Sequence, residues 1–229
     1  MKYMIHACPD RMWYVEQFLI PSMLEQGISR ADIIVWNDEE KKGNLWATMD
    51  SFEFCAKKEG GYWHLQDDVL IAKDFYERTK DSDKDIECGF CHYKFENRDG
   101  RSVDRVGRVK SQYMWSSFPC IYIPNWIIAD FVKWFYKKAL YRSEYTNFIY
   151  EKKHDDSFWR DYVNEERIYD TVVNIAPALI DHVDWLIGGS VINTMRGTNC
   201  RAYYWEDEER LEDLKNKLRQ KGFGNRILF

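Results

Sequence analysis

The chain has 229 residues, of which 45% are hydrophobic and 17% aromatic, so it can build a sizeable core and is not intrinsically disordered. Its net charge of -5 gives no general attraction to nucleic acid or to an anionic membrane surface. No apolar run reaches membrane-spanning length, the N-terminus does not resemble a signal peptide, and six cysteines without such a signal indicate free thiols. We therefore expect a cytoplasmic location.

The first third of the sequence alternates between strand and helix patterns. Short apolar stretches rich in strand-forming residues lie at 2–7, 32–36 and 61–66. Between them, apolar residues recur at helical spacing, and Pro21 is expected to kink or end the first helix. Gly27 closes that helical unit, and Gly60 stops the second helix. The alternation predicts an α/β fold with a parallel, doubly wound sheet.

The remainder of the chain is less regular. Further strands are predicted at 86–95, 112–123 and 171–175. Further helices are predicted with Pro124 in the first turn, through Tyr162, and at 206–220. The stretch 94–110 carries six lysines and arginines and two glycines, which predict a loop or a hairpin. The segment 176–182 is expected to lead into a loop through residue 190. Because no repeat or clear linker is visible, one domain covering residues 1–229 is the simplest interpretation.

Two adjacent carboxylates mark the end of the third predicted strand. The strand runs into Gln66-Asp67-Asp68, so these acids would emerge at its carboxyl end, where open α/β sheets bind ligands. Two neighbouring acids repel each other unless a cation or a proton lies between them. Hard oxygen ligands suit Mg²⁺ or Mn²⁺, with substrate phosphates completing the coordination shell. The alternative is a solvated turn that happens to carry two acids.

Further segments accompany this acid pair in order along the chain. Ala7-Cys8-Pro9-Asp10-Arg11 follows the first strand, and Asp38 follows the second. His154-Asp155-Asp156 precedes a short helix, and Pro177-Ala178-Leu179-Ile180-Asp181-His182 comes after the strand at 171–175. Together with Gln66-Asp67-Asp68, these segments resemble the motifs of glycosyltransferases of the GT-A fold, of bacterial or phage type. The resemblance covers roughly residues 2–190.

The resemblance implies a Rossmann-like α/β fold, with a mostly parallel central sheet and helices on both faces. Gln66-Asp67-Asp68 is similar to the xDD variant of the family's Asp-x-Asp motif, in which the last Asp binds the metal. By this match Asp68 and His182 hold Mn²⁺ or Mg²⁺. Asp155 or Asp156 would be the catalytic base of an inverting transfer. The residues implied in binding the nucleotide-sugar are Ala7, Pro9, Arg11, Asp38, Gln66 and Asp67.

The implied function is metal-dependent transfer of a sugar from a nucleotide diphosphate sugar, a UDP-sugar above all, to a hydroxyl acceptor. Residues of about 1–75 would form the nucleotide-sugar-binding half, about 76–200 the acceptor and catalytic half, and 201–229 a C-terminal helix. We expect the acceptor to be a glycan, a protein or a hydroxylated DNA base. A DNA acceptor would have to be flipped out of the duplex, and the basic loop 94–110 is the feature that favours it.

Two other classes of protein share parts of this pattern. A nucleotidyltransferase would use the same sheet and acids, but usually has a glycine-rich basic loop where this chain has Cys8-Pro9-Asp10-Arg11. A non-catalytic nucleotide- or sugar-binding module would not need Asp155 and Asp156, which are also typical of acids at a helix start. Two alternatives concern single features: Arg11 could pair with a surface acid, and the basic loop could be only a solvated hairpin.

Cys88-Gly89-Phe90-Cys91-His92 formally matches haem-attachment and zinc-binding patterns. Haem attachment of this type needs export, and zinc needs a second pair of ligands. The position of the segment in a strand-like run favours core packing instead.

Overall fold

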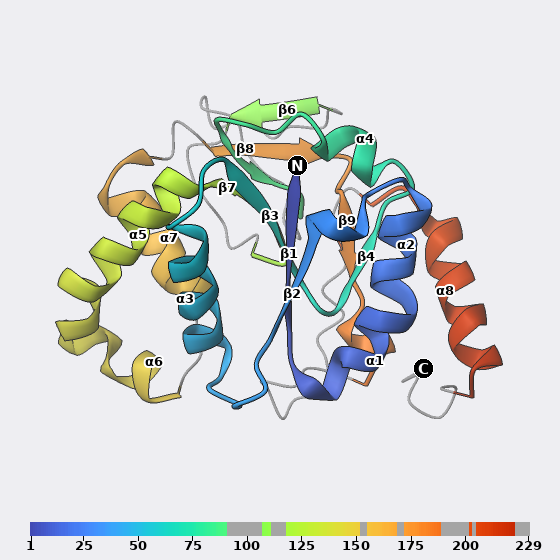
Figure 1. Cartoon of the computed structure of the whole chain (residues 1–229), viewed down its shortest axis with the longest axis horizontal. Coiled ribbons are helices and arrows are strands. Elements are labelled where there is room, and N and C mark those ends of the chain that lie inside the picture. The colour runs from blue at the N-terminus through green and yellow to red at the C-terminus, as the bar shows by residue number, and fades with distance from the viewer. Residues whose placement is uncertain are drawn as a thin grey trace.

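The computed structural model describes residues 1–90, 107–110, 118–151, 155–168, 172–188, 202 and 205–222. Seven described strands form the main sheet, in the order β2-β1-β3-β7-β5-β8-β6 (Figure 1). Their bounds are β1 Lys2–Ala7, β2 Ile33–Asn37, β3 Gly61–Gln66, β5 Ile86–Cys88, β6 Gly107–Lys110, β7 Cys120–Pro124 and β8 Val172–Ala176. A second, antiparallel pair joins β4, Val69–Ile71, to β9, Ile180–His182.

Helices cover both faces of the main sheet. They are α1 Met12–Tyr14, α2 Ile20–Glu25, α3 Asn44–Cys55, α4 Phe75–Thr79, α5 Asn125–Lys137, α6 Thr146–Glu151, α7 Asp155–Glu165 and α8 Glu208–Gln220. Because successive strand residues point to opposite faces, Tyr3 packs with the α2 and α8 side, whereas Met4 packs with the α3, α5 and α7 side (Figure 1). The predicted α/β class, with helices on both faces, is confirmed.

The first three strands of the sheet run parallel, as the sequence predicts. β1 lies between β2 and β3, with Ile5 opposite both Val35 and Leu65. β7 then runs antiparallel between β3 and β5, and β6 runs antiparallel at the far edge. Five of the seven described strands therefore point the same way, and the sheet is mostly parallel. The carboxyl ends of β1, β2 and β3 consequently meet at one edge.

Several predicted bounds in the middle of the chain differ from the structure. Of the strand expected at 112–123, residues 118–123 are described, and β7 begins at Cys120. Of the one expected at 86–95, residues 86–90 are described, and β5 ends at Cys88. Pro124 ends β7 and is the N-cap of α5, rather than lying within the helix. Ile180–His182, for which no element was predicted, is a strand because it pairs with β4. Such pairing with a distant partner leaves no trace in local periodicity.

The first helical segment continues through Pro21 instead of ending there. A turn of π-helix, Val15–Leu19, follows α1 and leads directly into α2, which carries Pro21 in its first turn. Proline has no backbone N–H to donate, so a first turn, or a widened turn before it, accommodates the residue. The segment closes at Gly27, whose φ of 91° suits glycine, as predicted.

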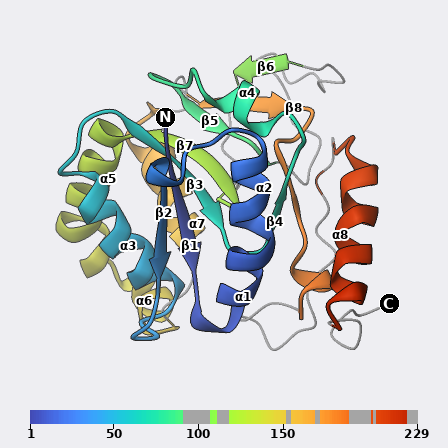
Figure 2. The same ribbon diagram turned by 45° about the vertical axis from the view of Figure 1, so that its right-hand side comes forward.

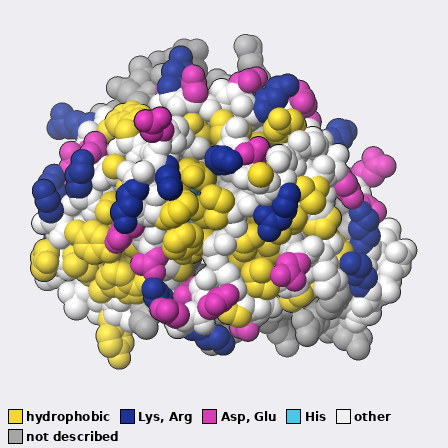
Figure 3. Space-filling model, viewed as in Figure 1, with side chains coloured by type: hydrophobic (Ala, Val, Ile, Leu, Met, Phe, Trp, Pro, Cys, Tyr) yellow, Lys and Arg dark blue, Asp and Glu magenta, His cyan; other side chains and the backbone are white. Residues whose placement is uncertain are grey.

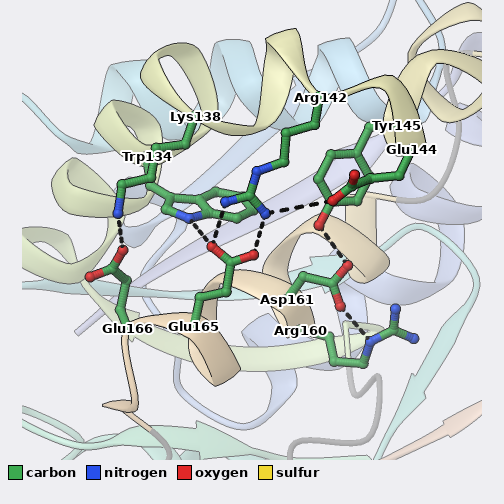
Figure 4. A network of polar contacts seen from close by, with 9 residues as sticks. All are labelled: Trp134, Lys138, Arg142, Glu144, Tyr145, Arg160, Asp161, Glu165 and Glu166. Atoms are coloured by element: carbon green, nitrogen blue, oxygen red, sulfur yellow. Dashed lines mark hydrogen bonds and ion pairs between the residues drawn. The ribbon is translucent and has the colours of Figure 1, made fainter.

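A network of polar contacts fixes α7 to α5 and to the short turns that follow it (Figure 4). Glu165 accepts hydrogen bonds from Trp134 Nε1 at 3.0 Å and Arg142 Nη2 at 2.8 Å. The Arg142 guanidinium also lies 5.7 Å from the Trp134 ring centroid, and Lys138 pairs with Glu166 at 2.6 Å. These contacts hold the end of α7, the helix whose first residue is Asp155.

The C-terminal helix α8 completes the core on the other side of the sheet (Figure 2). Leu211, Leu214 and Leu218 are buried along one face, as the predicted amphipathic pattern requires. Just before the helix, Asp207 accepts a hydrogen bond from the backbone N–H of Lys73 at 3.0 Å.

No described helix has the length and apolar character needed to cross a membrane. On the face drawn in Figure 3, charges of both signs are interspersed among apolar side chains.

Candidate active site

A cavity of about 350 Å³ opens where the parallel strands β1, β2 and β3 end. This volume lies within the range typical of ligand pockets. The described residues that line it are His6, Ala7, Cys8, Pro9, Asp10, Arg11, Trp36, Asp38, Lys41, Gly43, Asn44, Ala47, Thr48, Gln66, Asp67, Asp68 and Glu151. The edge of the sheet predicted to bind a ligand is thus the edge that carries the cavity.

One guanidinium holds the acid pair. Arg11 Nη1 donates to Asp67 Oδ1 at 3.2 Å and also contacts Asp68 Oδ2. The backbone N–H of Cys8 donates to Asp67 Oδ2 at 2.9 Å. All three charged side chains are buried, and Arg11 is only 5% exposed. The loop after β1 and the acids after β3 are therefore locked together by ionic hydrogen bonds.

The small β4–β9 sheet brings His182 to the same acids. Val69 lies opposite His182 in the ladder, and the Val183 N–H donates to the backbone oxygen of Asp68 at 2.8 Å. His182 Nε2 consequently lies 3.2 Å from Asp68 Oδ2, while its Nδ1 lies 3.6 Å from Asp184 Oδ1. The two residues predicted as metal ligands are in contact, although His182 does not line the cavity.

The charges of this cluster shift one another's pKa values. Burial alone would raise the pKa of Asp68, but the attraction of His182 and Arg11 outweighs it and holds the pKa below its usual range. Burial and repulsion from Asp68 raise the pKa of Asp67, only partly offset by Arg11. Burial would lower the pKa of His182, yet the carboxylate of Asp68 raises it to about 9. The cluster therefore favours a positive His182 beside a negative Asp68.

The Mn²⁺ or Mg²⁺ predicted from the sequence does not fit this arrangement. Asp68 Oδ1 is buried without a hydrogen-bond partner in the described part of the chain, which would suit a ligand atom. However, the guanidinium of Arg11 already lies against both acids. Asp67 and Asp68 would attract a divalent ion, but Arg11, which already contacts Asp67 Oδ1 and Asp68 Oδ2, would repel it. Among the described residues, no three His, Cys, Asp or Glu side chains converge on a common ion position.

The loop after β2, which is held by hydrogen bonds within itself, forms one wall of the cavity. Both carboxylate oxygens of Asp38 accept backbone N–H groups, Oδ1 from Lys42 at 2.8 Å and Oδ2 from Gly43 at 2.9 Å. Lys41, between Asp38 and its two donors, has a φ of 51°. The hydrogen bonds from Lys42 and Gly43 to Asp38 stabilise this left-handed conformation. Asp38 lines the cavity as predicted, but in the structure its carboxylate shapes the loop.

The acid pair at the start of α7 lies behind another wall of the cavity. Asp155 is 4% exposed and accepts hydrogen bonds from Asn44 Nδ2 at 2.5 Å and Thr48 Oγ1 at 2.8 Å. Burial and repulsion from Asp156 raise its pKa to about 7. Asp156 accepts the N–H of Ser157 at 2.8 Å. Neither carboxylate lines the cavity, whereas Asn44 and Thr48, which hold Asp155, do.

The structure thus gathers most of the predicted binding residues in one place. Those that line the cavity are Ala7, Pro9, Arg11, Asp38, Gln66, Asp67 and Asp68. Cys88 is buried in β5, in agreement with core packing. The described residues do not include His154, Cys91, His92 or residues 94–106 of the basic loop. Of that loop, they include only β6.

Some cavity residues were missed by the sequence analysis. Trp36 is the residue before the end of β2, and it lines the cavity. Asn44 and Thr48 stand four residues apart on α3, a spacing that places them on one helical face. This spacing of two polar residues, directly after Gly43, was the sequence signal that could have predicted them as cavity residues. Lys41 and Glu151 gave none, because both come from segments without a regular pattern.

No protein-family model and no curated protein matches the sequence. Likenesses among solved structures include A197 from STIV, at 8% identity and a TM-score of 0.41 over 79% of this chain and 84% of that one. S. aureus TarS 1–349 has 11% identity and a TM-score of 0.42 over 80% and 61%. The galactosyltransferase LgtC, in complex with donor and acceptor sugar analogues, has 12% identity and a TM-score of 0.42 over 95% and 96%. At these identities and TM-scores, likeness defines no activity for this chain.

Proposed function

We propose that this chain transfers a sugar from a nucleoside diphosphate sugar, a UDP-sugar above all, to a hydroxyl acceptor. The observation that carries the proposal is the cavity at the ends of three parallel strands, lined by a buried guanidinium, two buried acids and a tryptophan. Arg11 supplies positive charge for a diphosphate, because a guanidinium binds phosphate oxygens in a fixed planar geometry. Trp36 supplies a ring against which a nucleotide base can stack.

In the proposed reaction the acceptor oxygen bonds to the anomeric carbon, and the bond from that carbon to the diphosphate breaks. Negative charge then builds on the leaving diphosphate, where a fixed positive charge would stabilise it. The proton of the hydroxyl passes to a carboxylate. Asp155 and Asp156 remain the proposed candidates, and the pKa of Asp155, about 7, suits a base near neutral pH. A glycan, a protein or a hydroxylated DNA base is the proposed acceptor.

The proposal is tested by calorimetric titration with UDP, GDP, ADP and CDP, supported by thermal unfolding. A ligand at about 100 times its dissociation constant stabilises the folded state by about 2.7 kcal/mol, so the melting temperature should rise clearly. Trp36→Ala should weaken binding by about tenfold or more. Trp126→Ala is the matched control, because Trp126 is 59% exposed and lies on α5 at the opposite edge of the sheet. If no nucleotide binds with or without Mn²⁺, the proposed function is wrong.

The burial of Asp155 favours one second candidate, a nucleotide-sugar-binding module without transfer. In the structure, Asn44 and Thr48 separate this carboxyl from the cavity. Incubation with a UDP-sugar and candidate acceptors distinguishes the two functions. An enzyme should lose about 10²-fold or more of its transfer rate in Asp155→Asn or Asp156→Asn while keeping its nucleotide affinity. Binding without any turnover would support the module instead.

A further inference from the structure

We infer that the cation of this site is the side chain of Arg11, so that a nucleoside diphosphate binds without a divalent metal ion. The inference rests on the proposed function and specifies how its diphosphate is held. It follows from one observation: the buried guanidinium of Arg11 lies against both acids of the pair, and all three residues line the cavity.

The position of Arg11 is set by the backbone around it. Arg11 is the last residue of a single 3₁₀ turn, Pro9–Arg11, and its N–H donates to the Cys8 oxygen at 3.0 Å. The Cys8 N–H in turn donates to Asp67. The turn that carries the guanidinium is therefore tied to one of the acids that the guanidinium contacts. A side chain anchored in this way keeps its charge in place before a ligand arrives, which lowers the cost of binding.

The acids acquire a different role in this arrangement. With a guanidinium between them, Asp67 and Asp68 are positioning residues that orient Arg11, and they need not bind a metal ion. A guanidinium carries five N–H groups in one plane, so the same group can contact carboxylate and phosphate oxygens. When the bond between the anomeric carbon and the diphosphate breaks, the electron pair stays on the diphosphate oxygen. Arg11 is the positive group placed to stabilise that charge.

The test measures UDP affinity calorimetrically on the full chain, once with EDTA and once with Mn²⁺. We expect dissociation constants that agree within about twofold. Arg11→Lys keeps the charge but loses the planar donor geometry, and should weaken binding by about tenfold or more in EDTA. Arg30→Lys is the matched control, because Arg30 is exposed and distant from the cavity. It should bind UDP as the wild type does.

A third variant tests the exchange of one cation for another. Arg11→Gln keeps polar atoms beside the acids but removes the charge, so UDP binding should become dependent on Mn²⁺. Thermal unfolding of each variant verifies that it is folded, and Arg11→Lys carries the test alone if Arg11→Gln is not.

The outcomes are distinct. Wild-type binding that is at least tenfold tighter with Mn²⁺ would overturn the inference and leave the proposed function standing. Equal affinity of Arg11→Lys and the wild type in EDTA would also overturn the inference. An absence of nucleotide binding under both conditions would remove the proposed function and the inference with it.

Discussion

Ionisation of the Asp155 carboxyl group lowers the free energy of unfolding. Its pKa rises from the ordinary 3.8 to about 7 in the folded chain, chiefly because it is buried. Below pH 3.8 it is protonated in both the folded and the unfolded chain. Between pH 3.8 and about 7 the unfolded chain loses this proton while the folded chain keeps it. Each step up in pH therefore favours unfolding, and the contribution of this group to stability falls across that window.

Asp155→Asn should remove this pH dependence. An asparagine can still accept from Asn44 and can donate to Thr48, so the hydrogen bonds survive. The free energy of unfolding of the variant, relative to the wild type, should rise by at least about 1.4 kcal/mol between pH 4 and pH 7, the value of one pKa unit. Urea unfolding at several pH values measures it. The exposed Asp130→Asn is the control, and a variant difference that stays constant with pH would contradict the assignment.

Sequence position located the acids but not their partners. Acids that follow parallel strands converge at one edge, which is why Asp38 and the Asp67–Asp68 pair were placed correctly. What each carboxylate contacts depends on loops folding back in three dimensions. Asp38 binds the N–H groups of its own loop, and Asp155 binds two side chains of α3. The contacts of Asp155 join segments that are 111 and 107 residues apart, so they have no local sequence signal.

At the scale of single elements, Gly61 shows how closely β3 and β7 approach. A Cβ at this position would lie 2.9 Å from the backbone oxygen of Ile123 and would meet the hydroxyl of Tyr122. Gly61→Ala should therefore destabilise the protein by about 1–3 kcal/mol, the usual cost of overpacking. Adding Tyr122→Phe removes the hydroxyl and should restore part of that loss. A double-mutant cycle in urea measures both, and a Gly61→Ala protein as stable as the wild type would refute the close approach.

Elements with strong local patterns were predicted better than elements made by pairing. β1 and the amphipathic α8 appear where periodicity placed them. β9 was not predicted, because three residues carry no periodicity and the strand exists only through its pairing with β4. The reversed direction of β7 was likewise invisible, since apolar patterning marks a strand but not its direction.

At the scale of the whole molecule, the two faces of the sheet contribute different residues to the site. The α3 and α7 side supplies Asn44, Thr48 and Asp155, whereas the β4–β9 side supplies His182. The acids after β3 stand between them. Alternation of strands and helices predicts that both faces are covered. It does not predict that the site draws on residues from both, because that depends on how distant segments dock.

The β4–β9 pair also has a consequence for the order in which the protein folds. It joins Asp68 to His182, which are far apart in the sequence, whereas β1 and β2 are close neighbours along the chain. Closing the longer loop costs more chain entropy, so contacts of this kind form slowly. In pulse-labelling hydrogen exchange during refolding, the Val183 amide, which donates to the Asp68 oxygen, should become protected later than the amides of β2. Simultaneous protection would show that the two halves of the site form together.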